Sequence, residues 1–135
     1  MRFAARESLG QLMQVATHAT KVLPILLKEV KNNDYRMRCA AYRALGQLAQ
    51  AAPQHGMQVL PHLLEALKDQ DEDVRYVASC SLGQLVQATP HATKVLLHLL
   101  KAVEDINEDV RHAACEALKK LEQAKNEDQE MILLD

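Results

Sequence analysis

Histidine is the residue type through which this chain could most directly do metal chemistry. His18, His55 and His91 recur at steps of 37 and 36 residues, and His62 and His98 are also 36 residues apart. If recurring residues sit on packed helices, they lie roughly 8–10 Å apart. Ligand atoms of one zinc ion lie about 2 Å from the metal, so such residues cannot share an ion. The spacing predicts no metal and no cofactor, and it places these histidines at helix starts and in loops.

The cysteines and the acidic runs form no catalytic pattern either. Cys39, Cys80 and Cys115 occupy three different places in the repeat described below, and the sequence contains no Cys-x-x-Cys motif and no His-Glu pair. Free thiols are typical of a reducing compartment, which favours a cytoplasmic protein. The runs "KDQDED" and "EDINED" lack the spaced ligands and the glycine of a calcium loop. We therefore expect a protein that is not an enzyme.

Composition excludes further classes of protein. The 135 residues carry a net charge of −2, and 48% of them are hydrophobic. A slightly acidic chain disfavours general binding to a nucleic-acid backbone, which needs a basic excess. No apolar run approaches the length of a membrane span, and no signal peptide opens the chain.

An internal repeat of about 36 residues organises the chain. "LGQL" occurs at 9–12, 45–48 and 82–85, and a weaker "LKKL" lies at 118–121. A second block, "VLPILL", "VLPHLL" and "VLLHLL", keeps the same step. Fixed periods of this length are the signature of repeat architectures.

Each unit contains two amphipathic helices separated by an acidic turn. In the second helix Val74, Ala78 and Leu82 lie on one stripe. The acidic residues favour the start of that helix, and the proline and glycine of "AAPQHG" and "ATPH" break the chain between units. We predict helices over 1–15, 19–31, 35–51, 56–68, 72–88, 92–104 and 108–125.

Neither helix of a unit can bury its apolar stripe alone, so the units must stack. The expected fold is all-α: a right-handed α-solenoid of stacked helical hairpins, or α-α superhelix. It forms a single domain, 1–135, with about 3 full repeats at 19–51, 56–88 and 92–125. A partial repeat at 1–15 and a C-terminal helical stub at 128–135 complete it.

The sequence resembles the HEAT-repeat family of armadillo-like α-solenoids. The family pattern has proline in the first helix, aspartate near the turn and Val-Arg at the start of the second helix. Matching residues here are Pro24, Pro61, Asp69, Asp105, Val74-Arg75 and Val110-Arg111, whereas Asn32 and Leu97 depart from the pattern. The resemblance implies a structural ladder of hydrogen bonds between units, carried by Asp69, Asp105, Arg38, Arg75 and Arg111.

The resemblance also implies that the second helices line a concave surface. Three of the four aromatic residues fall off the apolar stripe of these helices. Aromatic and arginine side chains anchor interfaces, although the same tyrosines could instead fill space between helices. The predicted partner-binding strip consists of Phe3, Arg6, Glu7, Tyr42, Arg43, Tyr76, Ser79, Cys80, His112 and Glu116.

Both ends of the sequence fall inside the repeat. The chain begins with a second helix, and "EMILLD" aligns with the first-helix segment "KVLLHL". In one interpretation the chain is a fragment of a longer solenoid. In the other it is complete, and the tail at about 128–134 packs on another molecule or folds back as a cap. Self-association through the incomplete terminal repeats is therefore one expectation.

A protein–protein interaction module, or scaffold, is the function that these features favour. Its partner would be another protein or a peptide bound on the concave surface, with no membrane involved. Two alternatives remain open. Relatives of HEAT type include enzymes and lyase subunits, and others bind nucleic acid. The arginines of the second helices favour the nucleic-acid alternative, and the acidic balance opposes it.

Overall fold

A computed structural model describes residues 19–86 and 93–134, with side chains over 19–86 and 95–123. Within these ranges every regular element is a helix, and no strand occurs. A helix over 19–29 is followed by α2 (Tyr35–Ala51), the short 3-10 helix η1 (Pro53–His55), α3 (Gly56–Ala66) and α4 (Glu72–Leu85). The remaining helices are α5 (Thr93–Ala102) and α6 (Glu108–Leu134). None of the described helices is both long enough and apolar enough to span a membrane.

Most predicted helices are observed, with differences at their ends. The helix predicted over 35–51 has those bounds, while the helices predicted over 19–31, 56–68 and 92–104 each end two residues earlier. The helix predicted over 1–15 lies outside the described residues. The stub predicted over 128–135 is helical as far as residue 134, but it is not separate from the preceding helix, because α6 continues without a break. No proline or glycine stands between 122 and 130 to end the helix.

Polar side chains in the turns set where the second helices begin. Asp34 Oδ1 accepts a hydrogen bond from the backbone N of Arg36 at 2.9 Å, and Asp71 Oδ1 accepts one from Asp73 at 2.8 Å. At the start of α6, Asn107 Oδ1 accepts from the backbone N of Val110 at 3.1 Å. These caps satisfy amide groups that have no partner within the helix, so the turn residues fix the starts of α2, α4 and α6.

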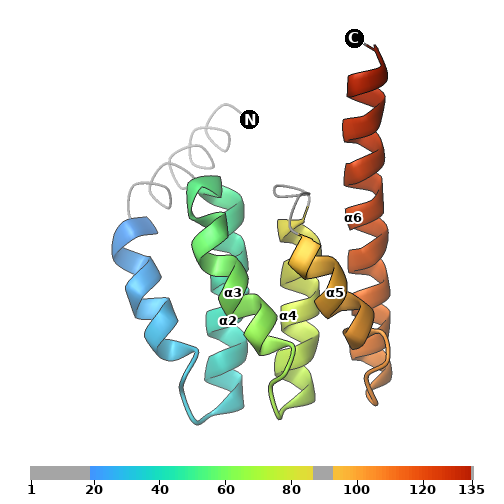
Figure 1. Ribbon diagram of the computed structural model, residues 1–135. Coiled ribbons are helices and arrows are strands. Elements are labelled where there is room, and N and C mark those ends of the chain that lie inside the picture. The colour runs from blue at the N-terminus through green and yellow to red at the C-terminus, as the bar shows by residue number, and fades with distance from the viewer. Residues whose placement is uncertain (1–18, 87–92, 135) are drawn as a thin grey trace, which may run out of the picture.

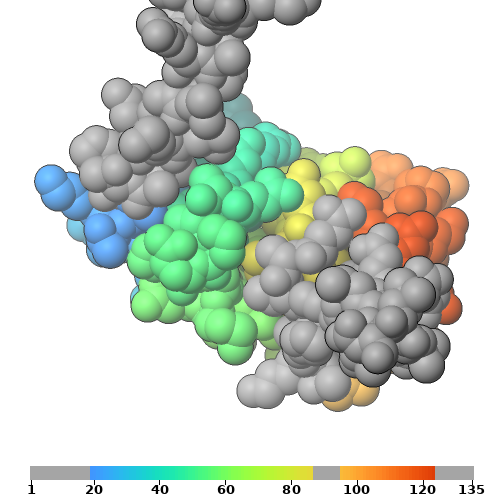
Figure 2. Space-filling view, turned by 90° about the horizontal axis from the view of Figure 1, so that it is seen from above, coloured from blue at the N-terminus to red at the C-terminus, as the bar shows by residue number. Residues whose placement is uncertain are grey.

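The helices lie in two rows. The second helices α2, α4 and α6 stand side by side, with α4 packed between the other two (Figure 1). The first helices, which are residues 19–29, α3 and α5, form the other row (Figure 1). Seen from above, the units follow one another across the molecule in chain order (Figure 2). Each unit thus touches its neighbours along the chain, as the repeat requires.

Several pairs of equivalent positions in neighbouring units are both buried. Val59 and Val95, Leu63 and Leu99, and Val74 and Val110 are all fully buried. The stripe that the periodicity predicts is therefore the core, and it continues from unit to unit. Each unit excludes water from its apolar stripe only with the help of its neighbours.

Gly46 and Gly83 of the "LGQL" motifs lie where neighbouring second helices come into close contact. A Cβ at Gly46 would lie 2.9 Å from Ser81 Oγ and 3.0 Å from Ser81 Cβ. A Cβ at Gly83 would lie 3.3 Å from the Cα of Ala117. No described residue has a positive φ. Glycine is therefore required here by the spacing between helices and not by the backbone conformation.

Gly46→Ala is expected to lower the free energy of unfolding by about 1 kcal/mol. Overpacking costs about 1–3 kcal/mol, which outweighs the gain of about 1 kcal/mol in helix propensity. In a Ser81→Gly background the added methyl group has room, so the same substitution should stabilise by about 1 kcal/mol. Urea denaturation of the four variants measures this coupling. Stabilisation in both backgrounds would contradict the close approach of α2 and α4.

Candidate partner-binding surface

Two bidentate ion pairs join the turns of neighbouring units. Arg38 donates to both carboxylate oxygens of Asp69 at 3.0 Å, and Arg75 donates to those of Asp105 at 2.8 and 3.2 Å. The side chains of these four residues are only 13–17% exposed. Paired hydrogen bonds between guanidinium and carboxylate fix an orientation as well as a distance. The pairs therefore set how each second helix sits beside the next turn.

Each of these arginines also closes its own turn. Arg75 Nη1 donates to the carbonyl oxygens of Asp69 and Gln70 at 2.9 and 3.1 Å. Arg38 does the same in the preceding turn, and Arg111 does so in the following one. Within the described residues Arg111 has no carboxylate partner, so the structure brings together four of the five predicted ladder residues. The bonds to backbone carbonyls were not predicted, because a side-chain pattern carries no signal for them.

Each aspartate of the two ion pairs accepts hydrogen bonds both from an arginine and from a backbone N of its own turn. Asp105 Oδ1 accepts from the backbone N of Asn107 at 2.9 Å, in addition to its bonds from Arg75. Burial alone would raise the pKa of Asp105, but the hydrogen bonds from Arg75 and Asn107 outweigh it and hold that pKa below the usual range. Asn32, the departure from the repeat pattern, accepts from Asp34 N at 2.9 Å in the same way. An amide can close the turn, but it carries no charge for an arginine.

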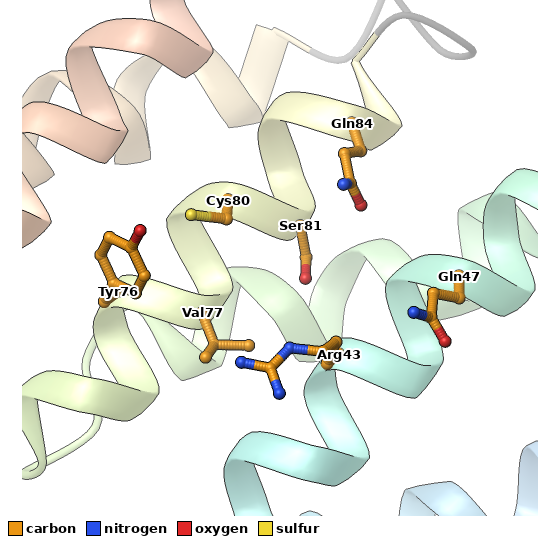
Figure 3. A pocket seen from close by; sticks show the side chains of 7 residues that line it. All are labelled: Arg43, Gln47, Tyr76, Val77, Cys80, Ser81 and Gln84. Atoms are coloured by element: carbon orange, nitrogen blue, oxygen red, sulfur yellow. The ribbon is translucent and has the colours of Figure 1, made fainter.

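Two grooves run between the second helices, and Tyr76 borders both of them. The groove between α2 and α4 has a volume of about 280 Å³. Its lining residues are shown in Figure 3: Arg43, Gln47, Tyr76, Val77, Cys80, Ser81 and Gln84. The groove between α4 and α6 has a volume of about 260 Å³, and its lining includes Tyr76, Cys80, Gln84, His112, Glu116 and Lys120. We call the exposed residues of both grooves the second-helix strip: Arg43, Gln47, Tyr76, Cys80, Gln84, His112, Glu116 and the partly exposed Lys120.

The structure divides the predicted strip into three groups. Arg43, Tyr76, Cys80, His112 and Glu116 are exposed and line the grooves. The positions predicted at Phe3, Arg6 and Glu7 lie outside the described residues.

Tyr42 and Ser79 are both buried, although Ser79 also contributes to the lining of the groove between α4 and α6. Tyr42 is 6% exposed and its burial raises its pKa, while Ser79 is fully buried and donates to the carbonyl of Arg75. The two positions are equivalent in the repeat, and they face the interior of the stack. Of the two readings that the sequence left open for Tyr42, filling space between helices is the one observed.

Three strip residues were missed by the sequence analysis. Gln47, Gln84 and Lys120 occupy the third position of the "LGQL" and "LKKL" motifs, and all three line the grooves. A signal for them was available, since each is a polar residue next to a buried leucine of the stripe. The motif thus combines a core leucine, a small or polar spacer and an outward-facing polar side chain.

The strip combines aromatic, charged and amide side chains. The hydroxyl of Tyr76 lies beside the thiol of Cys80, and the hydrogen bond between them raises the pKa of Tyr76. Among the described residues no group of three or more His, Cys, Asp or Glu side chains is arranged to hold a metal ion. The strip presents an aromatic ring, a guanidinium and two amides beside small apolar surfaces, which are groups that contact other proteins.

The sequence matches the model of one known protein family. The family model described as "Sister chromatid cohesion protein PDS5 protein" matches residues 7–134. This match spans nearly the whole sequence, including both grooves and both ion pairs. The comparison with curated proteins gives no match.

Proposed function

We propose that this chain, which belongs to the PDS5 family, is a non-catalytic protein-interaction module that binds a partner along its second-helix strip. Its fold would be a right-handed solenoid of HEAT type, with the strip on the concave side. The observation that carries the proposal is the pair of adjacent grooves bordered by Tyr76, an aromatic residue that is 42% exposed. Tyrosines in such positions are common interface anchors.

The family's description supports a setting for this role. It names a sister chromatid cohesion protein, so we propose that the partner is a protein that works on chromosomes. The cytoplasm was favoured by the free thiols alone. A reducing compartment includes the nucleus as well, and the family description favours chromatin within it.

The alternatives from the sequence have less support. Arg38, Arg75 and Arg111 are held by carboxylates or backbone carbonyls. They are therefore committed to the turns and not free for phosphates. This observation weakens the nucleic-acid alternative, whose main support was the number of arginines on second helices.

Tyr76→Ala is expected to abolish partner capture while leaving the fold intact. An anchor at the centre of an interface contributes about 2 kcal/mol or more, which corresponds to about a thirtyfold loss of affinity. The measurement is co-precipitation from chromatin extract with the tagged chain, quantified by mass spectrometry, together with the thermal midpoint of each variant.

Two control variants make that result specific. Lys101→Glu changes an exposed residue of α5, outside the strip, and should capture the same proteins as the wild type. Tyr42→Ala should lower the thermal midpoint, since it opens a cavity in the core. If Tyr76→Ala retained every partner at wild-type levels, the strip would not be the binding surface.

A further inference from the structure

Arg43 differs from the other described arginines. Arg36 pairs with Asp34, Arg38 and Arg75 form the bidentate pairs, and Arg111 bonds to carbonyl groups. Within the described part of the chain, Arg43 makes no hydrogen bond or ion pair. Its guanidinium points across the groove between α2 and α4, toward the helix that carries Tyr76 and Val77 (Figure 3).

The groove that holds Arg43 has no acidic group to neutralise it. Its other lining residues are two glutamines, a tyrosine, a cysteine, a serine and a valine. The neighbouring groove, in contrast, contains Glu116 together with Lys120. A guanidinium presents a rigid fork of donors that matches a carboxylate. The first groove therefore suits an acidic side chain of a partner, and the second groove does not.

Gln47 and Gln84 stand at equivalent places on the two helices that form this groove. Both are exposed, and neither forms a hydrogen bond with another described residue. An amide side chain offers a donor and an acceptor together. That combination matches the backbone of a chain that forms no internal hydrogen bonds.

The spacing of the helices matches a particular backbone conformation. Neighbouring packed helices lie about 8–10 Å apart, so equivalent glutamines repeat at about that interval. A polyproline II segment advances about 9.3 Å in its three-residue turn, and its backbone groups remain unpaired. A segment that crosses the second helices in this conformation would meet one equivalent glutamine in each turn.

We propose that the groove between α2 and α4 binds the carboxylate of a Glu or Asp side chain in an extended partner segment. Arg43 receives the carboxylate, and Gln47 and Gln84 bind the backbone on either side. The inference rests on the proposed function and adds the chemistry of the partner. Recognition of a preformed extended segment by a groove on folded protein is an established mode of peptide binding.

The test uses random nine-residue peptides displayed on phage and selected against the whole 135-residue chain. Parallel selections use the Arg43→Glu and Lys101→Glu variants. Sequences selected by the wild type should be enriched in Asp and Glu at one position. The Lys101→Glu selection should give the same enrichment, and the Arg43→Glu selection should lose it. Lys101→Glu changes the net charge equally and lies outside the groove, so it controls for charge alone.

A synthetic copy of one enriched peptide then gives an affinity by fluorescence anisotropy. It should bind the wild type about tenfold more tightly than a copy with Gln in place of the enriched acid. With Arg43→Glu this tenfold difference should vanish, and with Gln47→Ala both copies should weaken equally.

The outcomes separate this inference from the proposed function. Selected peptides that bind without a preference for acid, or whose preference survives Arg43→Glu, would overturn the carboxylate site and leave the strip as a binding surface. If no peptide were enriched, or if Tyr76→Ala did not weaken any selected peptide, both the inference and the strip would be overturned.

Discussion

Asp105→Ala is expected to lower the free energy of unfolding by about 3 kcal/mol. The substitution removes both carboxylate acceptors of Arg75 and leaves a guanidinium, only 13% exposed, without its counter-charge. Breaking one side of a largely buried pair costs about 3–5 kcal/mol, and the residual exposure places the effect at the lower end. The loss also frees the backbone N of Asn107, which Asp105 holds at 2.9 Å. Urea denaturation followed by circular dichroism at neutral pH measures this change in the free energy of unfolding.

Asp105→Asn and an acid titration distinguish charge from packing. The amide keeps the shape and one acceptor, so it should cost less than alanine. The folded pKa of Asp105 lies below its usual value. The wild type should therefore be more stable than Asp105→Asn at every pH above that usual value, and this difference is the wild-type advantage. It should be constant above about pH 5 and begin to shrink near pH 4, where the carboxylate of the unfolded chain takes up a proton. It should be lost as the pH falls through the lower pKa of the folded state. An advantage independent of pH would contradict an electrostatic origin.

The described helices show which parts of this fold can be predicted from sequence. The start and end of α2 agree with prediction because Asp34 caps one end and Pro53 follows the other. The end predicted at 125 differs from the observed end of α6 at Leu134, because the alignment of "EMILLD" with a first helix says nothing about the local sequence that precedes it. The junctions "AAPQHG" and "ATPH" contain proline, and this one does not. The presence or absence of proline and glycine decides where a helix ends, even inside a repeat.

The candidate site was predicted in part, and the errors share a cause. Tyr42, Ser79 and Cys115 are equivalent in sequence, yet the first two are buried and the third is exposed. That column faces the next unit, and within the described residues α6 has no second helix beyond it. The column of Arg43, Cys80 and Glu116 is exposed in all three helices. Periodicity gives the face of a helix, but burial depends on which neighbour covers that face.

Met37 is another position whose burial differs from that of its equivalents. It is equivalent to Val74 and Val110, which are fully buried, but it is 46% exposed. In the described residues α2 packs against a second helix on one side only, whereas α4 has one on each side. Val110 is nevertheless fully buried although α6, like α2, packs against one second helix among the described residues. The number of neighbouring second helices does not by itself decide whether this position is buried.

Leu99→Ala in α5 is expected to lower the free energy of unfolding by about 3 kcal/mol. Leu99 is fully buried at a position equivalent to the buried Leu63. Removing its side chain loses transfer free energy and leaves a cavity, and such substitutions cost about 2–5 kcal/mol. Because each unit is stabilised mainly by its neighbours, the loss should spread beyond α5. Hydrogen exchange should therefore show weaker protection in α4 and α6 as well, while denaturation gives the total.

Leu97→Ala supplies a matched control on the same helix. Leu97 is 62% exposed and stands where the repeat pattern has proline, so its truncation should change stability by less than about 0.5 kcal/mol. The two substitutions remove the same atoms from α5 and differ only in burial. Equal costs for both would mean that α5 does not pack as described. A loss of protection confined to α5 in Leu99→Ala would mean that the units are not coupled, and the stack would then be a row of independent hairpins.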